Sequence, residues 1–150
     1  MEIKFARGES VADVITHLLR DTSGSINAAL YRFNHPGLAG ALEEAVRRGV
    51  RVRLLVDGNK YRESRSTQEL LARAIIPFRL GFGRQGRGSK MHHKFVILDQ
   101  QTVLTGSYNW TLESENENHE NLLIVRDPLP VQAYGQEFEA LWSGADRDDS

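Results

Sequence analysis

Residues 91–99 read Met-His-His-Lys-Phe-Val-Ile-Leu-Asp, an aliphatic run preceded by two histidines and a lysine. Its β-branched and aliphatic content predicts a buried strand. Because residues two apart in a strand share a face, His92 and Lys94 are predicted to project together, while His93 points to the other side. Asp99 has the parity of His93, so we expect it to support the backbone or a neighbour. An imidazole beside an ammonium can act on one phosphate, the ring as nucleophile or base and the ammonium as fixed positive charge.

Polar side chains also accompany the next two predicted strands. A strand over 103–108 leads into a stretch where Ser107 and Asn109 share a face and offer a hydroxyl and an amide to phosphate oxygens. Glu120 stands just before a further apolar strand, and its carboxylate is placed to hold the imidazole of His92 in one tautomer. These positions predict one polar cluster at the ends of neighbouring strands.

The first half of the chain alternates helices and strands. Ser10 and Asp13 form a capping pattern before an amphipathic helix, and a second helix begins near Pro36. Buried strands are predicted over 25–33 and 50–56, and strands joined by a helix in this way run parallel. The remaining expected elements are a loop over 57–65, a helix capped by Ser66 and Glu69, a strand over 78–80, a glycine-rich loop over 81–89, a strand over 121–125, a helix after Pro128 and a frayed tail over 144–150.

These elements predict a single α/β domain over 1–150, an α-β-α sandwich whose mixed, largely parallel sheet is flanked by helices. The chain has 150 residues, of which 40% are hydrophobic and 26% charged, as in ordinary globular domains. With no cysteine there is no disulfide, no thiolate nucleophile and no cysteine-ligated metal. No apolar run reaches the roughly 18–20 residues of a membrane span, and residues 1–5 begin no signal peptide. We therefore expect a cytoplasmic protein without stable membrane association.

The net charge of -1 conceals an uneven distribution. Residues 47–94 carry a charge of +10 and residues 95–150 a charge of −9. A basic central stretch favours a polyanionic partner such as nucleic acid, although ordinary solvated faces would give the same count. Three basic residues just before His92 are candidate substrate contacts: Arg84, Arg87 and Lys90. Trp110 is a further candidate, since it could stack on a base, although an aromatic residue after a strand is more often core.

The polar residues form one pattern, and this pattern resembles the HKD motif of the phospholipase D superfamily: His92-x-Lys94-(x)4-Asp99, then Gly106-Ser107-x-Asn109-Trp110, then Glu120. The length and the single motif are most similar to the bacterial Nuc-type endonucleases and the Zucchini-type mitochondrial nucleases. Unlike the latter, the chain has no cysteine-based zinc finger. The resemblance covers about residues 10–145.

The resemblance implies the fold of that superfamily and a two-step transfer that needs no metal ion and no cofactor. His92 would attack the phosphorus to form a phosphohistidine, and a second histidine would protonate the leaving oxygen. The other roles that it implies are oxygen binding by Lys94 and Asn109, orientation of the site by Ser107, pairing of Glu120 with His92, and a chiefly structural part for Asp99.

The chain carries one His-x-Lys pair, whereas this mechanism uses two. The family places two motifs across a two-fold axis, so the resemblance implies a homodimer with one shared site. A zinc site is not expected, because His92 and His93 face opposite ways on a strand. Two alternatives to a nuclease stay open: a lipid phosphodiesterase of the phospholipase D or cardiolipin type, and a non-catalytic module that binds nucleic acid.

Overall fold

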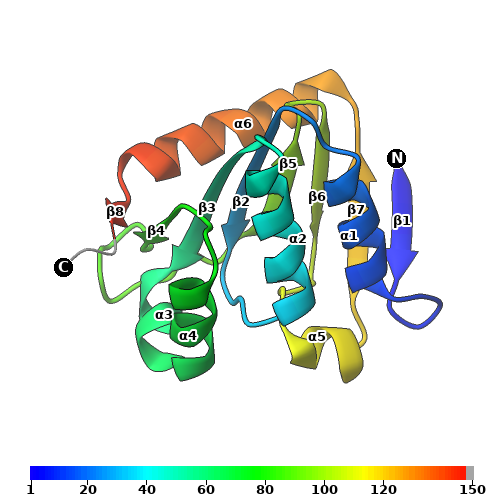
Figure 1. The fold of residues 1–150 in the computed structure, drawn as a ribbon. Helices are drawn as coiled ribbons and strands as arrows, with labels where there is room; N and C mark the ends of the chain where they lie inside the picture. The colour runs from blue at the N-terminus through cyan, green and yellow to red at the C-terminus, as the bar shows by residue number, and fades with distance from the viewer. Residues whose placement is uncertain (148–150) are drawn as a thin grey trace.

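The computed structural model describes residues 1–147, which form one mixed sheet with helices on both faces (Figure 1). The strands lie in the order β1-β7-β6-β5-β2-β3-β4-β8. Their bounds are β1 (Glu2–Phe5), β2 (Ser25–Leu30), β3 (Arg51–Asp57), β4 (Phe78–Gly81), β5 (Lys94–Leu98), β6 (Thr102–Gly106), β7 (Asn121–Val125) and β8 (Asp146–Arg147). The helices are α1 (Val11–Arg20), α2 (Pro36–Arg47), α3 (Gly58–Glu63), α4 (Arg65–Arg73), α5 (Leu112–Asn116) and α6 (Pro128–Ser143).

The mixed α/β sandwich is confirmed, but the prediction that its sheet is largely parallel is wrong. Among the described strands only β2–β3 and β3–β4 pair in parallel, and the other five neighbouring pairs are antiparallel. From β5 to β7, consecutive strands lie side by side in the sheet and no long helix joins them. A tight turn joins β5 to β6, with φ of 54° at Asp99 and 55° at Gln100, and the short α5 lies between β6 and β7. Connections this short return the chain antiparallel.

Helices bury both faces of the sheet. α1 and α2 pack together on one face, where Ile15 and Leu42 belong to one buried cluster with strand residues such as Leu54 (Figure 1). α6 runs across the opposite face, and its Phe138 belongs to a second cluster with Phe95 of β5. Side chains alternate between these two clusters along each central strand, as a strand buried on both sides requires.

The helix ends follow local sequence rules in the first half of the chain. Ser10 Oγ accepts a hydrogen bond from the Asp13 N–H at 3.1 Å, so the predicted N-cap of α1 is confirmed. Pro36 occupies the first turn of α2, as predicted. Gly49 follows that helix with a φ of 93°, a left-handed conformation that glycine adopts without a Cβ clash.

Two predictions in the middle of the chain are wrong. The predicted loop over 57–65 contains α3, because the Asp57 carboxylate caps that helix by accepting the Lys60 N–H at 2.9 Å. The cap of α4 is Ser64 and not Ser66. A hydroxyl is present at both positions, but the extended backbone of a cap residue occurs at Ser64, with φ −111° and ψ 105°.

The strands around the candidate site are shorter than predicted. β5 begins at Lys94, because the N–H of Met91 donates to the buried carboxylate of Asp57 instead of a neighbouring strand. β6 ends at Gly106, whose φ is 155°. A Cβ at this glycine would lie 2.3 Å from the carbonyl oxygen of Asn121, so the close approach of the two chains requires glycine here.

The C-terminal end differs in part from the predicted tail over 144–150. Residues 146–147 form β8 and pair with β4, so this part of the tail is ordered within the sheet. Residues 148–150 of the predicted tail lie outside the described residues. In the part of the chain that the structure describes, no helix is both long enough and apolar enough to span a membrane.

Candidate active site

The candidate site residues converge on one edge of the sheet. β5 runs antiparallel to β2, so Lys94, the first residue of β5, lies opposite Leu30, the last residue of β2. Gly106 likewise ends β6 opposite Leu122, the second residue of β7. This edge is formed by the carboxyl ends of the parallel strands, which is where ligands bind in open α/β sheets.

His92 and Lys94 lie together, although only Lys94 belongs to the strand. Lys94 Nζ is 3.5 Å from His92 Nδ1 and donates to the His92 carbonyl oxygen at 3.0 Å. His93 points to the other side of the sheet, where its Nε2 lies 3.0 Å from Glu137 Oε2 on α6. The alternation predicted for a strand therefore extends into the residues that precede it. It separates the two histidines, which also argues against a zinc site that uses both.

The surroundings of His92 favour its neutral form. Burial, and after it the positive charges of Lys94 and Lys90, lower the pKa of the imidazole, while the carboxylate of Asp57 opposes this shift. Burial also lowers the pKa of Lys94, and Glu120 opposes that shift. A neutral imidazole at neutral pH retains the lone pair that a nucleophile or a base needs.

Tyr31 is a neighbour of His92 that the sequence did not indicate. Its ring centroid lies 4.4 Å from that of His92, at an interplanar angle of 60°. Two ammonium groups lie near the same ring, Lys94 Nζ at 5.3 Å and Lys60 Nζ at 5.7 Å from its centroid. Tyr31 thus connects the His92–Lys94 pair to the start of α3. It directly follows β2, and in the sequence it is one more apolar residue of the predicted strand over 25–33.

Asp57 is a second residue that the sequence did not indicate. Its side chain is fully buried, and its Oδ1 accepts the N–H of Met91 at 2.8 Å while its Oδ2 caps α3. A single carboxylate therefore fixes the chain just before His92 and the helix that carries Lys60. An acidic residue at the end of an apolar strand, before glycine, was the available signal.

Ser107 and Glu120 form a hydrogen-bonded pair beside this group. Ser107 Oγ donates to Glu120 Oε1 at 2.5 Å and accepts the N–H of Asn121 at 3.0 Å. Glu120 Oε2 accepts a hydrogen bond from Asn118 at 3.0 Å. The structure therefore does not show the expected pairing of Glu120 with His92. The two carboxylate oxygens of Glu120 instead accept hydrogen bonds from Ser107 and Asn118. The charge of Glu120 acts on Lys94.

Asn109 has an unsatisfied buried oxygen. Within residues 1–147, its Oδ1 is the buried side-chain atom recorded without a hydrogen-bond partner. Buried polar atoms in folded proteins are nearly always paired, and the exceptions often mark places where a ligand completes the site. Ser107 and Asn109 both follow the end of β6 at Gly106, so the shared face that a strand over 103–108 predicted for them stays a prediction.

Asp99 lies apart from these residues. It follows the last residue of β5, at the opposite edge of the sheet from Lys94, and accepts backbone N–H bonds from Ser23 at 3.2 Å, Gly24 at 2.6 Å and Ser25 at 3.1 Å. Burial acts to raise its pKa, but the three hydrogen bonds outweigh burial and lower the pKa. Asp99 holds the chain that enters β2, and it does not reach the group around His92.

The basic residues before His92 are exposed. Arg87 is tied back to the C-terminal part of the chain, because its Nη2 donates to Asp146 Oδ2 at 3.0 Å. Lys90 lies near enough to His92 to lower its pKa, whereas Arg84 has no recorded ion pair among the described residues. The structure thus places Lys90 beside the candidate site and directs Arg87 away from it.

Trp110, a candidate for base stacking in the sequence, is instead a core residue. It is 3% exposed, and its ring packs edge-on against Phe33 at 6.1 Å. Its carbonyl oxygen accepts backbone N–H bonds from Asn34 and His35. Trp110 therefore anchors the segment after β6 and is not available to a substrate.

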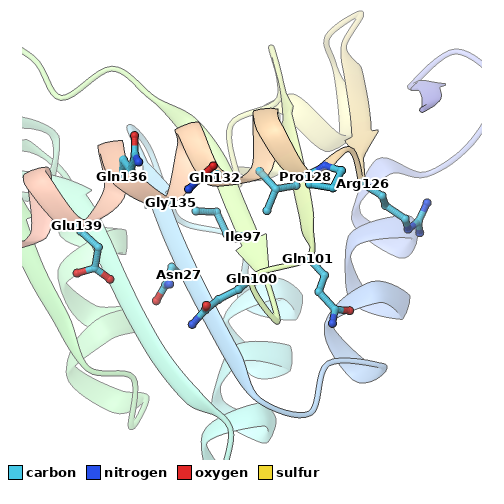
Figure 2. A pocket seen from close by; sticks show the side chains of 11 residues that line it. Asn27, Ile97, Gln100, Gln101, Arg126, Pro128, Gln132, Gly135, Gln136 and Glu139 are labelled. Carbon is cyan, nitrogen blue, oxygen red and sulfur yellow. The ribbon is translucent and has the colours of Figure 1, made fainter.

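A separate hollow of about 780 Å³ lies under α6, away from this site (Figure 2). Carboxamides line it, among them Asn27, Gln100 and Gln132. Gln100 lies in the turn after β5 and Asn27 in the first half of β2, whereas the site lies at Lys94 and Leu30, the other ends of these two strands. This hollow is not part of the candidate active site.

Comparison with known proteins gives relatives in sequence and, separately, solved structures with the same fold. Mitochondrial cardiolipin hydrolase from Xenopus tropicalis is 39% identical over 129 residues, which cover 86% of this chain and 60% of that protein. The protein of the same name from Homo sapiens is 35% identical over 135 residues, with coverages of 90% and 52%. The chain thus spans about half of the length of these relatives.

Two solved structures share the fold. Nuc from Salmonella typhimurium, described as a phospholipase D family member, superposes with a TM-score of 0.87 at 24% identity, over 99% of this chain and 97% of that chain. NucT from Helicobacter pylori gives a TM-score of 0.84 at 20% identity, over 97% and 99%. Both therefore match this structure over almost their whole length.

The family assignment rests on the sequence itself. A family model described as "Cardiolipin synthase, PLD-like domain" matches residues 15–142, which include β2 to β7 and the whole cluster around His92. The match covers most of the chain, and the fold agrees with it. The chain belongs to this phospholipase D-like family.

Proposed function

We propose that this chain is a phosphodiesterase that cleaves DNA or RNA internally, through a phosphohistidine at His92 and without a metal ion or a cofactor. The observation that carries the proposal is the 3.5 Å separation of Lys94 Nζ and His92 Nδ1 at the ligand-binding edge of the sheet. The imidazole supplies the nucleophile, and the ammonium supplies the positive charge that the transferred phosphoryl group requires.

The reaction has two displacement steps. In the first, an imidazole nitrogen of His92 attacks the phosphorus, the bond from phosphorus to the leaving oxygen breaks, and a second imidazole gives that oxygen its proton. In the second, water gives a proton to the second imidazole and attacks the phosphorus, and the bond between phosphorus and nitrogen breaks. Lys94 and the Asn109 amide bind the non-bridging oxygens throughout, and the hydrogen bond to Glu120 orients Ser107.

The second imidazole comes from a second copy of the chain. One His-x-Lys pair occurs in the sequence, and His93 points to α6 and away from His92. A two-fold axis close to His92 would bring two copies of the pair to one phosphate. The proposed enzyme is thus a homodimer with one site for each dimer.

Nucleic acid is the proposed substrate because residues 47–94, which contain Lys60, Lys90 and Lys94 near the site, carry a charge of +10. Those basic side chains of this stretch that lie near His92 would each gain from contact with a phosphate of a polyanion. The test is a parallel assay of single-stranded DNA, RNA, duplex DNA and vesicles that contain cardiolipin, with His92→Ala as the control. We expect the wild type to cleave nucleic acid and leave the vesicles intact. Cleavage of the lipid alone would contradict the choice of substrate.

A lipid phosphodiesterase is the second candidate, since the relatives at 39% and 35% identity are named mitochondrial cardiolipin hydrolase. The same assay decides it. A non-catalytic module would bind nucleic acid without cleaving it, and His92→Ala would leave that binding unchanged. A cytoplasmic location stays a prediction, because those relatives are named as mitochondrial proteins.

A further inference from the structure

A second hollow, of about 320 Å³, is lined by Tyr31, whose ring lies 4.4 Å from that of His92. It lies between the ends of β2 and β3 and the helices α3, α4 and α5. Tyr31 and Asp57 line it, and both also belong to the surroundings of His92. A molecule in this hollow would therefore be adjacent to whatever His92 and Lys94 hold.

The lining of this hollow has two basic side chains, Arg32 and Lys60, against the three carboxylates of Asp57, Glu63 and Glu113. Lys60 Nζ lies 3.3 Å from Glu63 Oε2, and Arg32 Nη2 lies 3.0 Å from Glu113 Oε1. These four side chains all line the hollow. The hollow thus has no excess of positive charge, and this disfavours a second phosphate, whose charge would have to be compensated there.

The other polar groups of the lining are hydroxyls and one amide. Ser64, Ser66 and Thr67 lie at the start of α4, and Thr111 caps α5. Asn34 accepts the N–H of Leu112, the first residue of α5. Hydroxyl and amide groups donate as well as accept hydrogen bonds, as sugar hydroxyls and base edges do. An acyl chain placed here would offer no polar group to a lining that also contains five charged side chains, and this disfavours a lipid tail.

We propose that this hollow is a subsite for the sugar and base of the nucleotide next to the phosphate at His92. The proposal rests on the phosphodiesterase function and narrows its substrate to nucleic acid. The volume suits one nucleoside, since small-molecule pockets begin at about 300 Å³. The ring of Tyr31 lies between the proposed phosphate position and the hollow. Its centroid is 4.4 Å from the ring centroid of His92 and 5.7 Å from Lys60 Nζ.

Calorimetric binding to the full chain tests the subsite without turnover. The probes are a nucleoside monophosphate, inorganic phosphate and glycerol 3-phosphate, of which the last represents a lipid headgroup. We expect the nucleoside monophosphate to bind at least about tenfold more tightly than phosphate. Ser66→Trp, at an exposed position on the rim, should reduce this ratio to about one. The matched control is Ala72→Trp, also exposed on α4 but outside the lining, and it should keep the ratio.

The outcomes separate this proposal from the function on which it rests. Equal affinity of the wild type for the nucleoside monophosphate and for phosphate would overturn the subsite, as would an unchanged ratio in Ser66→Trp. Tighter binding of glycerol 3-phosphate than of the nucleoside monophosphate would overturn it in favour of a lipid headgroup. Hydrolysis of bis(p-nitrophenyl) phosphate, a diester without a nucleoside, tests the function separately. If the wild type does not hydrolyse this diester, the proposed phosphodiesterase activity is contradicted. The ratio of the two binding affinities then still tests the subsite.

Discussion

The buried carboxylate of Asp57 accepts the backbone N–H of Met91 at 2.8 Å, and Met91 is the residue directly before His92. The end of β3 thereby fixes the chain that enters β5. The same carboxylate also raises the pKa of His92 against the opposing effects of burial and of the neighbouring lysines. Asp57 is a positioning residue in this arrangement, acting on the candidate nucleophile through its backbone and its charge.

Asp57→Asn should shift the pH dependence of activity downward. The substitution removes a negative charge that raises the pKa of His92, so the imidazole should lose its proton at lower pH. The acidic limb of kcat/KM against pH should move to lower pH with the pKa. A stability loss of about 1–3 kcal/mol should accompany it, because a buried acceptor is weakened.

The control for this prediction is Asp99→Asn, which weakens three backbone hydrogen bonds at the opposite edge of the sheet. It should lower the stability and leave the acidic limb in place. An acidic limb that stays fixed or moves upward in Asp57→Asn would show that Asp57 has no electrostatic effect on His92.

Substitutions at residues 92–94 should have three different effects on hydrolysis of a phosphodiester. His92→Ala should abolish turnover and leave folding intact, because the side chain is exposed. Lys94→Ala should cost about 10²–10³-fold in kcat, the range for removal of one group that stabilises developing charge. His93→Ala should retain substantial activity, since His93 contacts Glu137 on the other side of the sheet. Equal losses at His92 and His93 would contradict the assignment of the two faces.

Chelation should not affect turnover. The groups assigned to nucleophile and charge stabilisation are the side chains of His92, Lys94 and Asn109, so the reaction should survive an excess of EDTA. The measurement is the initial rate with and without chelator, followed by addition of Mg²⁺ or Zn²⁺. Complete loss of the rate, restored by a metal ion, would contradict the proposed mechanism.

Salt should weaken binding to nucleic acid in proportion to the number of phosphate contacts. The slope of log affinity against log salt should be about −0.7 to −0.9 for each contact. Joint substitution of Arg84, Arg87 and Lys90 by Gln should flatten the slope by up to three contacts. Arg87 should contribute least, because it is paired with Asp146.

The control for the salt experiment is a triple substitution at the opposite edge of the sheet, where α1 and α2 end and β3 begins: Arg20→Gln, Arg47→Gln and Arg51→Gln. This variant has lost the same charge and should keep the wild-type slope. Equal flattening in both variants would mean that net charge, and not a substrate path near His92, determines the binding.

The sequence predicted the local features of the site better than its tertiary contacts. The shared side of His92 and Lys94 follows from the two-residue period of extended chain, which needs no knowledge of the fold. The contact of Asp57 with Met91 joins residues 34 apart in sequence, and no local pattern indicates it. The contact of Tyr31 with His92 is also long-range, and the apolar residues around Tyr31 in the sequence predict only that it is buried.

The sheet shows the same division between local and long-range information. The unit formed by β2, α2 and β3 was predictable, because a helix between two strands implies that they are parallel. The place of β5 between β2 and β6 depends on pairing of residues far apart in sequence, such as Ile26 and Leu98. Long-range pairing of this kind, together with the tight turn between β5 and β6, makes most of the sheet antiparallel.

In the proposed enzyme, one shared site requires His92 from two copies of the chain. The most direct measurement mixes equal amounts of wild type and His92→Ala under conditions of subunit exchange and follows the phosphodiesterase rate. Random pairing puts half of the wild-type chains into heterodimers, so the rate should fall to about one half of that of the same wild-type protein alone. A rate that stays unchanged after complete exchange, or full turnover by a chain that light scattering shows to be a monomer, would contradict the shared site.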